Sequence, residues 1–316
     1  MDQVFNSLPI QLVFDPSQRL YWPFLLSAGL VAYIYTIFSL RTYSLSTTFY
    51  NIKKTLLSPS SLLDIKLMFL NSGLKLFIFP FIALSSFSVS LVVLKTLRSL
   101  WPFFQGVEAS PIVISILAAA MAFIIDDFLR FFQHVLSHYW EPMNRLHRTH
   151  HSADVLTPLT FFRSHPLESF LSGLRNTLSL GLTLGLYSFI FGGVVSGLDI
   201  LGVNALGFLF NATFSNLRHS SIPLGFGPLE RILISPRMHQ IHHSNNPIHF
   251  NKNFGVALAI WDQLLGSYYR PSAQEMGQVS YGLERTRHES RSLSAALLAP
   301  FTKLKVFPIF KSSRMS

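Results

Sequence analysis

Residues 111–151 read PIVISILAAAMAFIIDDFLRFFQHVLSHYWEPMNRLHRTHH and join an apolar run to two clusters of histidines. The first part, Ile112–His138, is expected to form one long helix that leaves a membrane. Positions i and i+4 of a helix share one face, so His134 and His138 point to the same side. Pro142 is expected to start a second helix. The stretch therefore predicts imidazoles gathered at the end of an apolar helix.

The pattern His-x-x-His-His-Ser occurs twice, at residues 147–152 and 239–244. Each copy is expected to lie on a helix, the second one started by Pro236, so that its three imidazoles point at one site. Neutral imidazole is the commonest protein ligand for first-row transition metals. The predicted metal ligands are His134, His138, His147, His150, His151, His239, His242 and His243, with His219 as a ninth.

The number and type of these ligands predict two metal ions. The chain has no cysteine, which excludes disulfides, thiolate metal sites and iron–sulfur clusters and leaves nitrogen and oxygen as donors. Four ligands are enough for structural zinc, so eight or nine indicate two ions with about four nitrogens each and open positions. Beside apolar segments, two such ions suggest oxygen activation on a lipid substrate.

The composition is that of a membrane protein, with 49% hydrophobic and only 13% charged residues. Three charge-free runs are long enough to cross a bilayer, namely Phe24–Leu40, Leu76–Leu94 and Leu178–Leu198. A fourth, Pro111–Ile125, is long enough only with its flank, and Leu201–Phe214 is expected to be the return arm of a hairpin. No alternating pattern indicates a sheet. The predicted fold is all-α, a polytopic membrane helical bundle with a cytoplasmic histidine-rich cap.

The basic residues predict the orientation in the membrane. The formal net charge is +10, and in a chain this apolar it favours a positive cytoplasmic side over nucleic-acid binding. Basic residues around the histidine clusters place these on the cytoplasmic side, with the N-terminus opposite. Lys95 and Arg98 do not fit that scheme. No basic region precedes the first apolar run, so we expect a retained anchor rather than a cleaved signal peptide.

The chain divides into three predicted zones. Residues 1–110 form an N-terminal transmembrane region, in which residues 58–61 (SPSS) are expected to start a helix. Residues 111–270 hold all the histidine clusters. Residues 271–316 are a polar, basic tail with a possible amphipathic segment at Leu293–Phe310.

The histidine spacing and its flanking motifs resemble the fatty acid hydroxylase/sterol desaturase superfamily. The resemblance covers about residues 120–270 and rests on the following motifs: Asp127 with His134-x-x-x-His138, His147-Arg-Thr-His150-His151-Ser152, Arg163-Ser-His165-Pro-Leu-Glu168, Asn216-Leu-Arg-His219-Ser220, and Ser235-Pro-Arg-Met-His239-Gln-Ile-His242-His243-Ser244. Asn253-Phe-Gly255 and Trp261-Asp262-Gln-Leu-Leu-Gly266-Ser-Tyr268 are similar to the C-terminal signature of the superfamily.

The resemblance implies a membrane-embedded helical fold whose cytoplasmic cap holds two non-heme irons. It implies O2-dependent hydroxylation or desaturation of a sterol, fatty acyl chain, ether lipid or carotenoid, in the endoplasmic reticulum or a bacterial inner membrane. Electrons would come from an external donor, cytochrome b5 or a ferredoxin with its NAD(P)H reductase, and the basic cap suits an acidic donor.

Four further residues have expected roles outside the set of predicted ligands, and three of these have two alternatives. Many members of the superfamily carry another histidine just before the Asn216 motif, and here Asn216, one turn before His219, is expected to act through a water. His165 is either a ligand or a group that supports one. Asp127 either accepts an N–H from a ligand histidine or is a helix-end charge at the membrane surface. Glu168 either orients His165 or pairs with Arg163.

Two other functions remain open from the sequence. A non-catalytic metal-binding or metal-transport membrane protein would need ionisable residues inside its spans, and the charge-free runs argue against it. A zinc hydrolase acting on lipids is weakened by the absence of a His-Glu-x-x-His motif.

Overall fold

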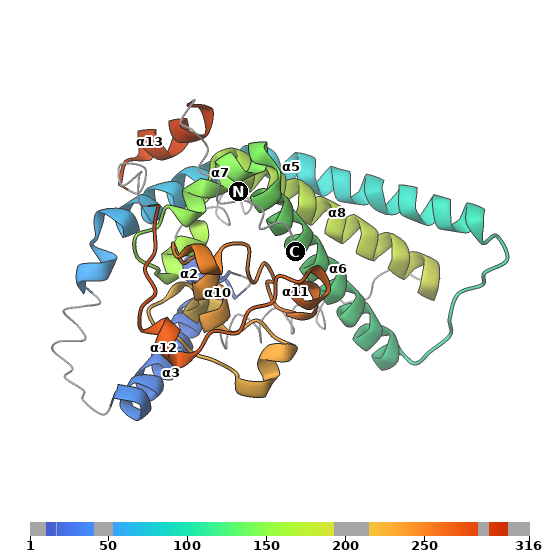
Figure 1. Ribbon diagram of the computed structural model, residues 1–316. Coiled ribbons are helices and arrows are strands. Elements are labelled where there is room, and N and C mark those ends of the chain that lie inside the picture. Colours follow the sequence, from blue (N-terminus) through green and yellow to red (C-terminus); the bar gives the residue numbers. More distant parts are fainter. Residues whose placement is uncertain (1–10, 17, 41–52, 193–214, 284–290, 303–316) are drawn as a thin grey trace, which may run out of the picture.

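The structure, a computed structural model, describes residues 11–16, 18–40, 53–192, 215–283 and 291–302. These residues are helical, and their only β pairings are two isolated bridges, Leu233 with Leu258 and Ser244 with Tyr281. The all-α prediction is confirmed for this part of the chain. Figure 1 shows long helices extending to one side of a group of short ones.

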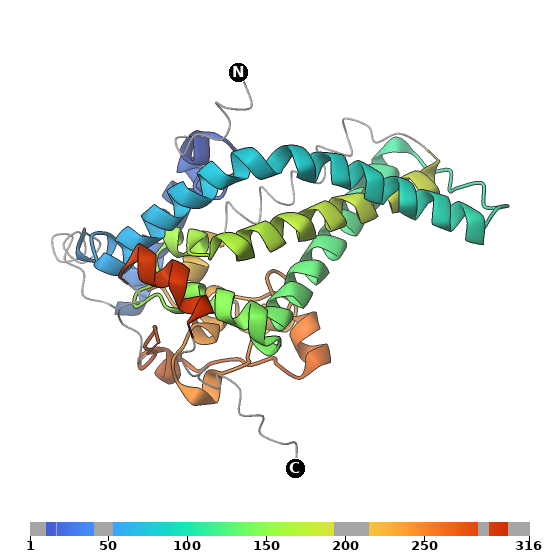
Figure 2. The same cartoon turned by 90° about the horizontal axis from the view of Figure 1, so that it is seen from above.

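Three long helices form the extended part of the molecule: α5 (Pro59–Leu100), α6 (Pro111–Tyr139) and α8 (Pro166–Phe191). Helices α5 and α8 run side by side, and α6 converges on them away from the short helices (Figure 2). Glycines let α5 and α8 approach closely, because a Cβ at Gly181 would lie 2.5 Å from the Cβ of Val89. The predicted helix start is confirmed by Ser58, whose side chain accepts the N–H of Ser61.

Among the described residues, α6 is the one helix long and apolar enough to cross a membrane. The helix predicted over Ile112–His138 is confirmed, because α6 runs from Pro111 to Tyr139 and continues through Asp126 and Asp127. The first predicted span forms α3 (Trp22–Leu40), whose apolar stretch among the described residues is Trp22–Phe38. Residues 193–214, which include the predicted return arm, lie outside the described residues. The polytopic bundle therefore stays a prediction.

Short helices gather at the C-terminal end of α6 and form what we call the cap, residues 141–163 and 215–283. Its elements are α7 (Glu141–His151), η1 (Pro158–Phe162), η2 (Ser215–His219), η3 (Gly227–Arg231), α10 (Pro236–His242), η4 (Pro247–His249), α11 (Ile260–Leu265) and α12 (Ala273–Met276). Prolines near the N-termini of α7 and α10 confirm the two helix starts that the sequence predicts.

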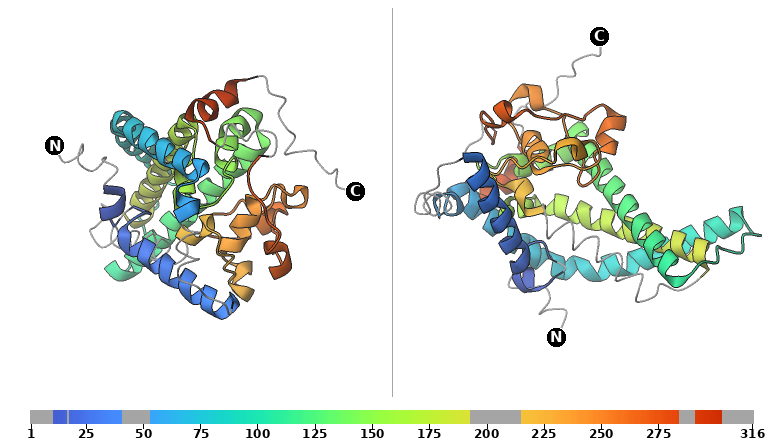
Figure 3. Two further views of the ribbon diagram at one scale, coloured as in Figure 1. Left: turned by 90° about the vertical axis from the view of Figure 1, so that its left-hand side faces the viewer. Right: turned by 90° about the horizontal axis from the view of Figure 1, so that it is seen from below.

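The remaining helices pack around this arrangement. Helix α2 (Gln11–Phe14) precedes α3, which runs across the long helices rather than along them (Figure 3) and packs against η2. The predicted amphipathic tail segment contains α13 (Leu293–Leu298) and η5 (Ala299–Phe301), and the positions after 302 lie outside the described residues. Ala296 of α13 packs with Leu63 and Leu67 of α5.

Candidate metal centre

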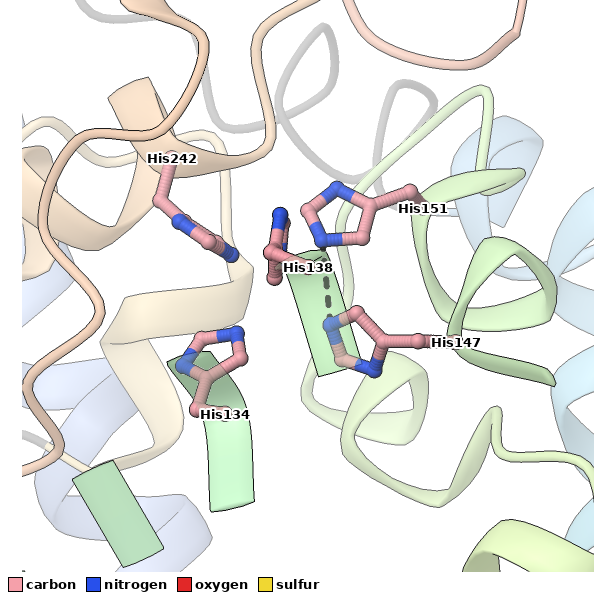
Figure 4. Close-up of side chains that lie close together, drawn as sticks. All are labelled: His134, His138, His147, His151 and His242. Atoms are coloured by element: carbon pink, nitrogen blue, oxygen red, sulfur yellow. Dashed lines mark hydrogen bonds between the residues drawn. The ribbon is translucent and has the colours of Figure 1, made fainter. Parts of the chain in front are cut away.

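The structure brings all nine predicted histidines together in two adjacent groups. The first group is His134, His138, His147, His151 and His242, and the second is His150, His219, His239 and His243. Within each group, one nitrogen of every ring lies within 4.8 Å of the others. The rings come from α6, α7, η2 and α10, and those of the first group face a common centre (Figure 4).

Each His-x-x-His-His motif contributes to both groups, so the prediction that its three imidazoles share one site is wrong. His147 and His151 enter the first group, whereas His150 enters the second. In the other motif, His239 and His243 enter the second group and His242 the first. Successive helix residues are turned by about 100°, so positions i+3 and i+4 point apart while i and i+4 stay close. Each group thus takes the i, i+4 pair of one motif and the i+3 ring of the other.

The geometry of the nitrogens fits metal binding. Nε2 of His147 lies 3.2 Å from Nε2 of His151, and Nε2 of His239 lies 3.0 Å from that of His219. Two nitrogens held about 2.1 Å from one ion at a right angle are separated by about 3 Å. Nε2 of His242 is buried without a hydrogen-bond partner, which costs about 1–3 kcal/mol unless an ion takes the lone pair.

Burial keeps these imidazoles neutral. It lowers the pKa of His242 to about 3, and it lowers the pKa of His150, His151, His219, His239 and His243 well below the usual value of 6.5. The neighbouring imidazoles act in the same direction, since two positive rings would repel each other. A metal binds only the deprotonated ring, so at neutral pH these rings are in the form that a metal requires.

Partners on Nδ1 fix the orientation of four rings. Nδ1 of His134 contacts the carbonyl of Phe254 at 2.7 Å, that of His242 contacts Lys252 O at 2.8 Å, and that of His150 contacts Arg163 O at 3.2 Å. Glu168 Oε1 lies 2.5 Å from Nδ1 of His147. An acceptor at Nδ1 holds the proton there and leaves the Nε2 lone pair for an ion.

His239 is held differently. Arg218 donates through Nη2 to its Nδ1 at 3.0 Å, and the same guanidinium donates to the carbonyls of Gly255, at 3.1 Å, and Val256. A guanidinium can only donate, so Nδ1 of His239 carries the lone pair in the neutral ring. The proton of the neutral His239 ring therefore lies on Nε2, and an ion bound at that nitrogen would have to replace it.

Comparison with known proteins finds a family that this part of the chain resembles. Residues 119–267, which contain all nine histidines, match the family model described as Fatty acid hydroxylase. Residues 119–267 are therefore similar in sequence to the fatty acid hydroxylase/sterol desaturase superfamily. The resemblance inferred from the sequence motifs is thereby confirmed.

Three relatives illustrate the range of the superfamily. The chain is 28% identical over 190 residues to ornithine lipid hydroxylase OlsE of Rhizobium tropici, covering 58% of this chain and 50% of that protein. It is 28% identical over 163 residues to alkylglycerol monooxygenase of Danio rerio, covering 52% and 32%. It is 27% identical over 184 residues to lathosterol oxidase of Homo sapiens, covering 58% and 54%. The matches thus span about half or less of each relative, and no solved structure matches.

Asp127 bonds to the loop that orients His134. Its buried carboxylate accepts the N–H groups of Ala257, at 2.8 Å, and Leu258, at 3.0 Å, and the indole N–H of Trp261, at 3.0 Å. These bonds fix the end of the loop whose Phe254 carbonyl orients His134.

Asp262, a residue of the C-terminal motif without a predicted role of its own, holds the other side of the same loop. Its carboxylate accepts the N–H groups of Phe254 and Gly255, each at 2.7 Å, and the hydroxyl of Ser267 at 2.6 Å. A Cβ at Gly255 would lie 2.7 Å from this carboxylate, so the close approach requires glycine. Two carboxylates, Asp127 and Asp262, therefore hold the loop that orients the first group.

A buried ion pair links α5 to the second group. The fully buried Arg163 donates to Asp64 at 2.7 Å, to the Thr149 carbonyl at 3.0 Å and to the Ser152 hydroxyl at 2.9 Å. Its own carbonyl accepts the Nδ1 proton of His150. Asp64 lies outside the family match, and sequence reasoning missed it. The sequence feature that could have identified Asp64 is that it is the lone carboxylate in the apolar segment Pro59–Leu100. A carboxylate buried in such a segment needs a partner.

The other residues with open roles are also resolved. Glu168 contacts His147 rather than His165 or Arg163. His165 lies outside both groups, where Nε2 contacts the Leu297 carbonyl at 3.2 Å and Nδ1 accepts the N–H of Leu167 at 3.2 Å. The Asn216 amide is bonded to Arg19, accepting from its Nε at 3.3 Å and donating to its carbonyl at 3.0 Å. Asn216 thus fastens the start of η2 to Arg19.

The division of each motif between the groups predicts how double substitutions affect metal content. Replacing His150 and His243, both in the second group, with alanine should remove about one ion per chain. Replacing the neighbours His150 and His151 should remove about two, because each belongs to a different group. Mass spectrometry of metals in the purified protein measures the content. His249→Ala, a buried histidine outside both groups, should retain both ions, and equal losses in the two double variants would contradict the division.

Asp64 is predicted to position His150 through Arg163. Asp64→Asn leaves the Arg163 charge buried and unpaired, which typically costs about 3–5 kcal/mol and frees the segment that orients His150. The expected result is a lower unfolding temperature and loss of about one ion per chain, with the first group still loaded. Asp126→Asn, which breaks the more exposed pair with Arg130, is the control and should change neither quantity. Full metal content in Asp64→Asn would show that the ion pair does not position the ring.

Proposed function

We propose that the chain is an O2-dependent lipid hydroxylase or desaturase with a non-heme diiron centre. The observation that carries the proposal is the convergence of nine imidazoles, most of them buried, into two adjacent groups within the segment that matches the fatty acid hydroxylase family. The names of the relatives describe lipid oxidation in each case: a lipid hydroxylase, a monooxygenase and a sterol oxidase.

The first group would hold one iron with His134, His138, His147, His151 and His242, and the second group would hold the other with His150, His219, His239 and His243. When bound, the irons supply the redox chemistry that activates dioxygen toward an unactivated C–H bond. Imidazole suits iron as well as zinc, copper and nickel, so the choice of iron rests on the superfamily.

The residues of the chain would provide orientation and exclude water. Phe254 is fully buried, and its ring lies 5.0 Å from that of His138 and 5.7 Å from those of His134 and His242, between centroids. It shields the first group from solvent and lowers the local dielectric. Both groups lie at the C-terminal end of α6, so a lipid chain that follows this apolar helix would reach them.

The remaining parts of the proposal concern the surroundings of the enzyme. We place it in the endoplasmic reticulum or a bacterial inner membrane, with the histidines on the cytoplasmic side, as the basic residues around them favour. Electrons would come from a separate carrier, cytochrome b5 or a ferredoxin with its NAD(P)H reductase. The relatives act on different lipids by name, so the substrate class stays open among sterol, fatty acyl, ether lipid and carotenoid.

The test is to express the chain in cells that lack it and to compare their lipids with those of cells expressing His242→Ala. The proposal predicts a product one oxygen heavier or two hydrogens lighter than its precursor, found only with the unsubstituted chain. The purified protein should contain about two irons and consume O2 when a reductant and carrier are supplied. Stoichiometric zinc without O2 consumption would contradict the proposal. Metal uptake into vesicles without a lipid product would favour the metal-transport alternative.

A further inference from the structure

Five large apolar side chains are exposed together on the cap. Leu229 and Ile232 lie on and just after η3, and Ile260, Leu264 and Leu265 lie on α11. Leu264 is 76% exposed, Ile232 58% and Leu229 57%. We call these five residues the η3–α11 patch. Single exposed apolar residues are common, but a contiguous set on two elements marks an interaction surface.

The backbone holds the two elements of the patch firmly together. The Ala259 N–H donates to the Ile232 carbonyl at 2.8 Å, and Leu233 pairs with Leu258 in a β bridge. The Gln263 side chain also donates to the Arg231 carbonyl at 2.6 Å. These bonds therefore hold the exposed side chains of the patch in fixed positions on the cap.

The patch continues the apolar surface of α6. Exposed apolar side chains recur at i+4 spacing along this helix, including Ile112, Ile116, Ile124, Phe128 and Phe132. The stripe reaches α11, because the Phe128 ring lies 5.2 Å from that of Trp261, between centroids. Asp127, next to Phe128, also binds the indole of Trp261, which fixes α11 against α6 (Figure 1).

We propose that the η3–α11 patch is inserted into the interfacial layer of the bilayer beside the point where α6 leaves it. The inference rests on the membrane location in the proposed function. Continuity with α6, the candidate span, identifies the occupant as lipid: a surface that extends the lipid-facing stripe meets the same lipid. The exposed Arg231 lies within the patch, where its charge suits anionic headgroups.

Insertion of the η3–α11 patch would fix the distance of the cap from the bilayer. Because α11 is fixed to α6 and to the loop that orients His134, lipid contact at Leu264 and Leu265 would hold the histidine groups at the membrane surface. A lipid substrate would then reach them without leaving the bilayer.

The chain has no cysteine, so single nitroxide labels can measure depth without background labelling. The variants are Leu264→Cys and Ile232→Cys in the patch, Ile116→Cys in the α6 stripe, and Ile248→Cys, an apolar residue of η4 that is 68% exposed. Each labelled full chain is placed in vesicles of phosphatidylcholine and phosphatidylglycerol. Collision rates with O2, which partitions into lipid, are compared with those of a water-soluble nickel chelate.

We expect the two patch labels to collide more often with O2 than with nickel, at a depth shallower than the Ile116 label. The Ile248 label should favour nickel. Patch labels as accessible to nickel as the Ile248 label, with Ile116 in lipid, would overturn the inference and leave the proposed function intact. An Ile248 label as deep as the patch would also overturn it, since insertion would not be specific. A water-exposed Ile116 label would overturn the membrane location itself.

Discussion

Imidazoles that converge on two small sites are best oriented when the other nitrogen of the ring is also bonded, and this constraint organises the cap. In four rings, Nδ1 faces a carbonyl or a carboxylate, and in His239 it faces a guanidinium. Those partners must be held in turn. The carboxylates of Asp127 and Asp262 fix the loop that carries Phe254, and Asp64 fixes Arg163. Much of the buried polar structure thus serves the orientation of the rings.

The arrangement also couples the two groups mechanically. Each motif sends rings to both groups, so a shift of α7 or α10 would disturb both at once. The loop around Phe254 has the same effect, because its carbonyls accept from His134 of the first group and, through Arg218, support His239 of the second. Two ions held in this way would keep a fixed separation, which suits chemistry that uses both.

Local spacing predicted the helices and the set of histidines, because i, i+4 contacts depend on a single helix. It could not predict how the rings divide, since this depends on where α7 and α10 pack relative to each other. The contacts of Asp127 and Asp64 could not be predicted from the sequence for a related reason. Asp127 bonds to Ala257, 130 positions away, and Asp64 bonds to Arg163, 99 positions away, so neither partner is visible in a sequence window. The apolar runs likewise indicated helices, and the helix predicted over Ile112–His138 agrees with α6 to within one residue at each end.

Mössbauer spectroscopy of the reduced chain loaded with iron-57 tests the central claim most directly. The two groups offer five and four imidazoles, so the irons should differ in coordination. The account predicts two high-spin ferrous doublets of equal area with different quadrupole splittings. In His150→Ala, one doublet should be lost or changed while the other stays. A single doublet from one iron per chain, or a protein that retains zinc and takes up no iron, would contradict the account.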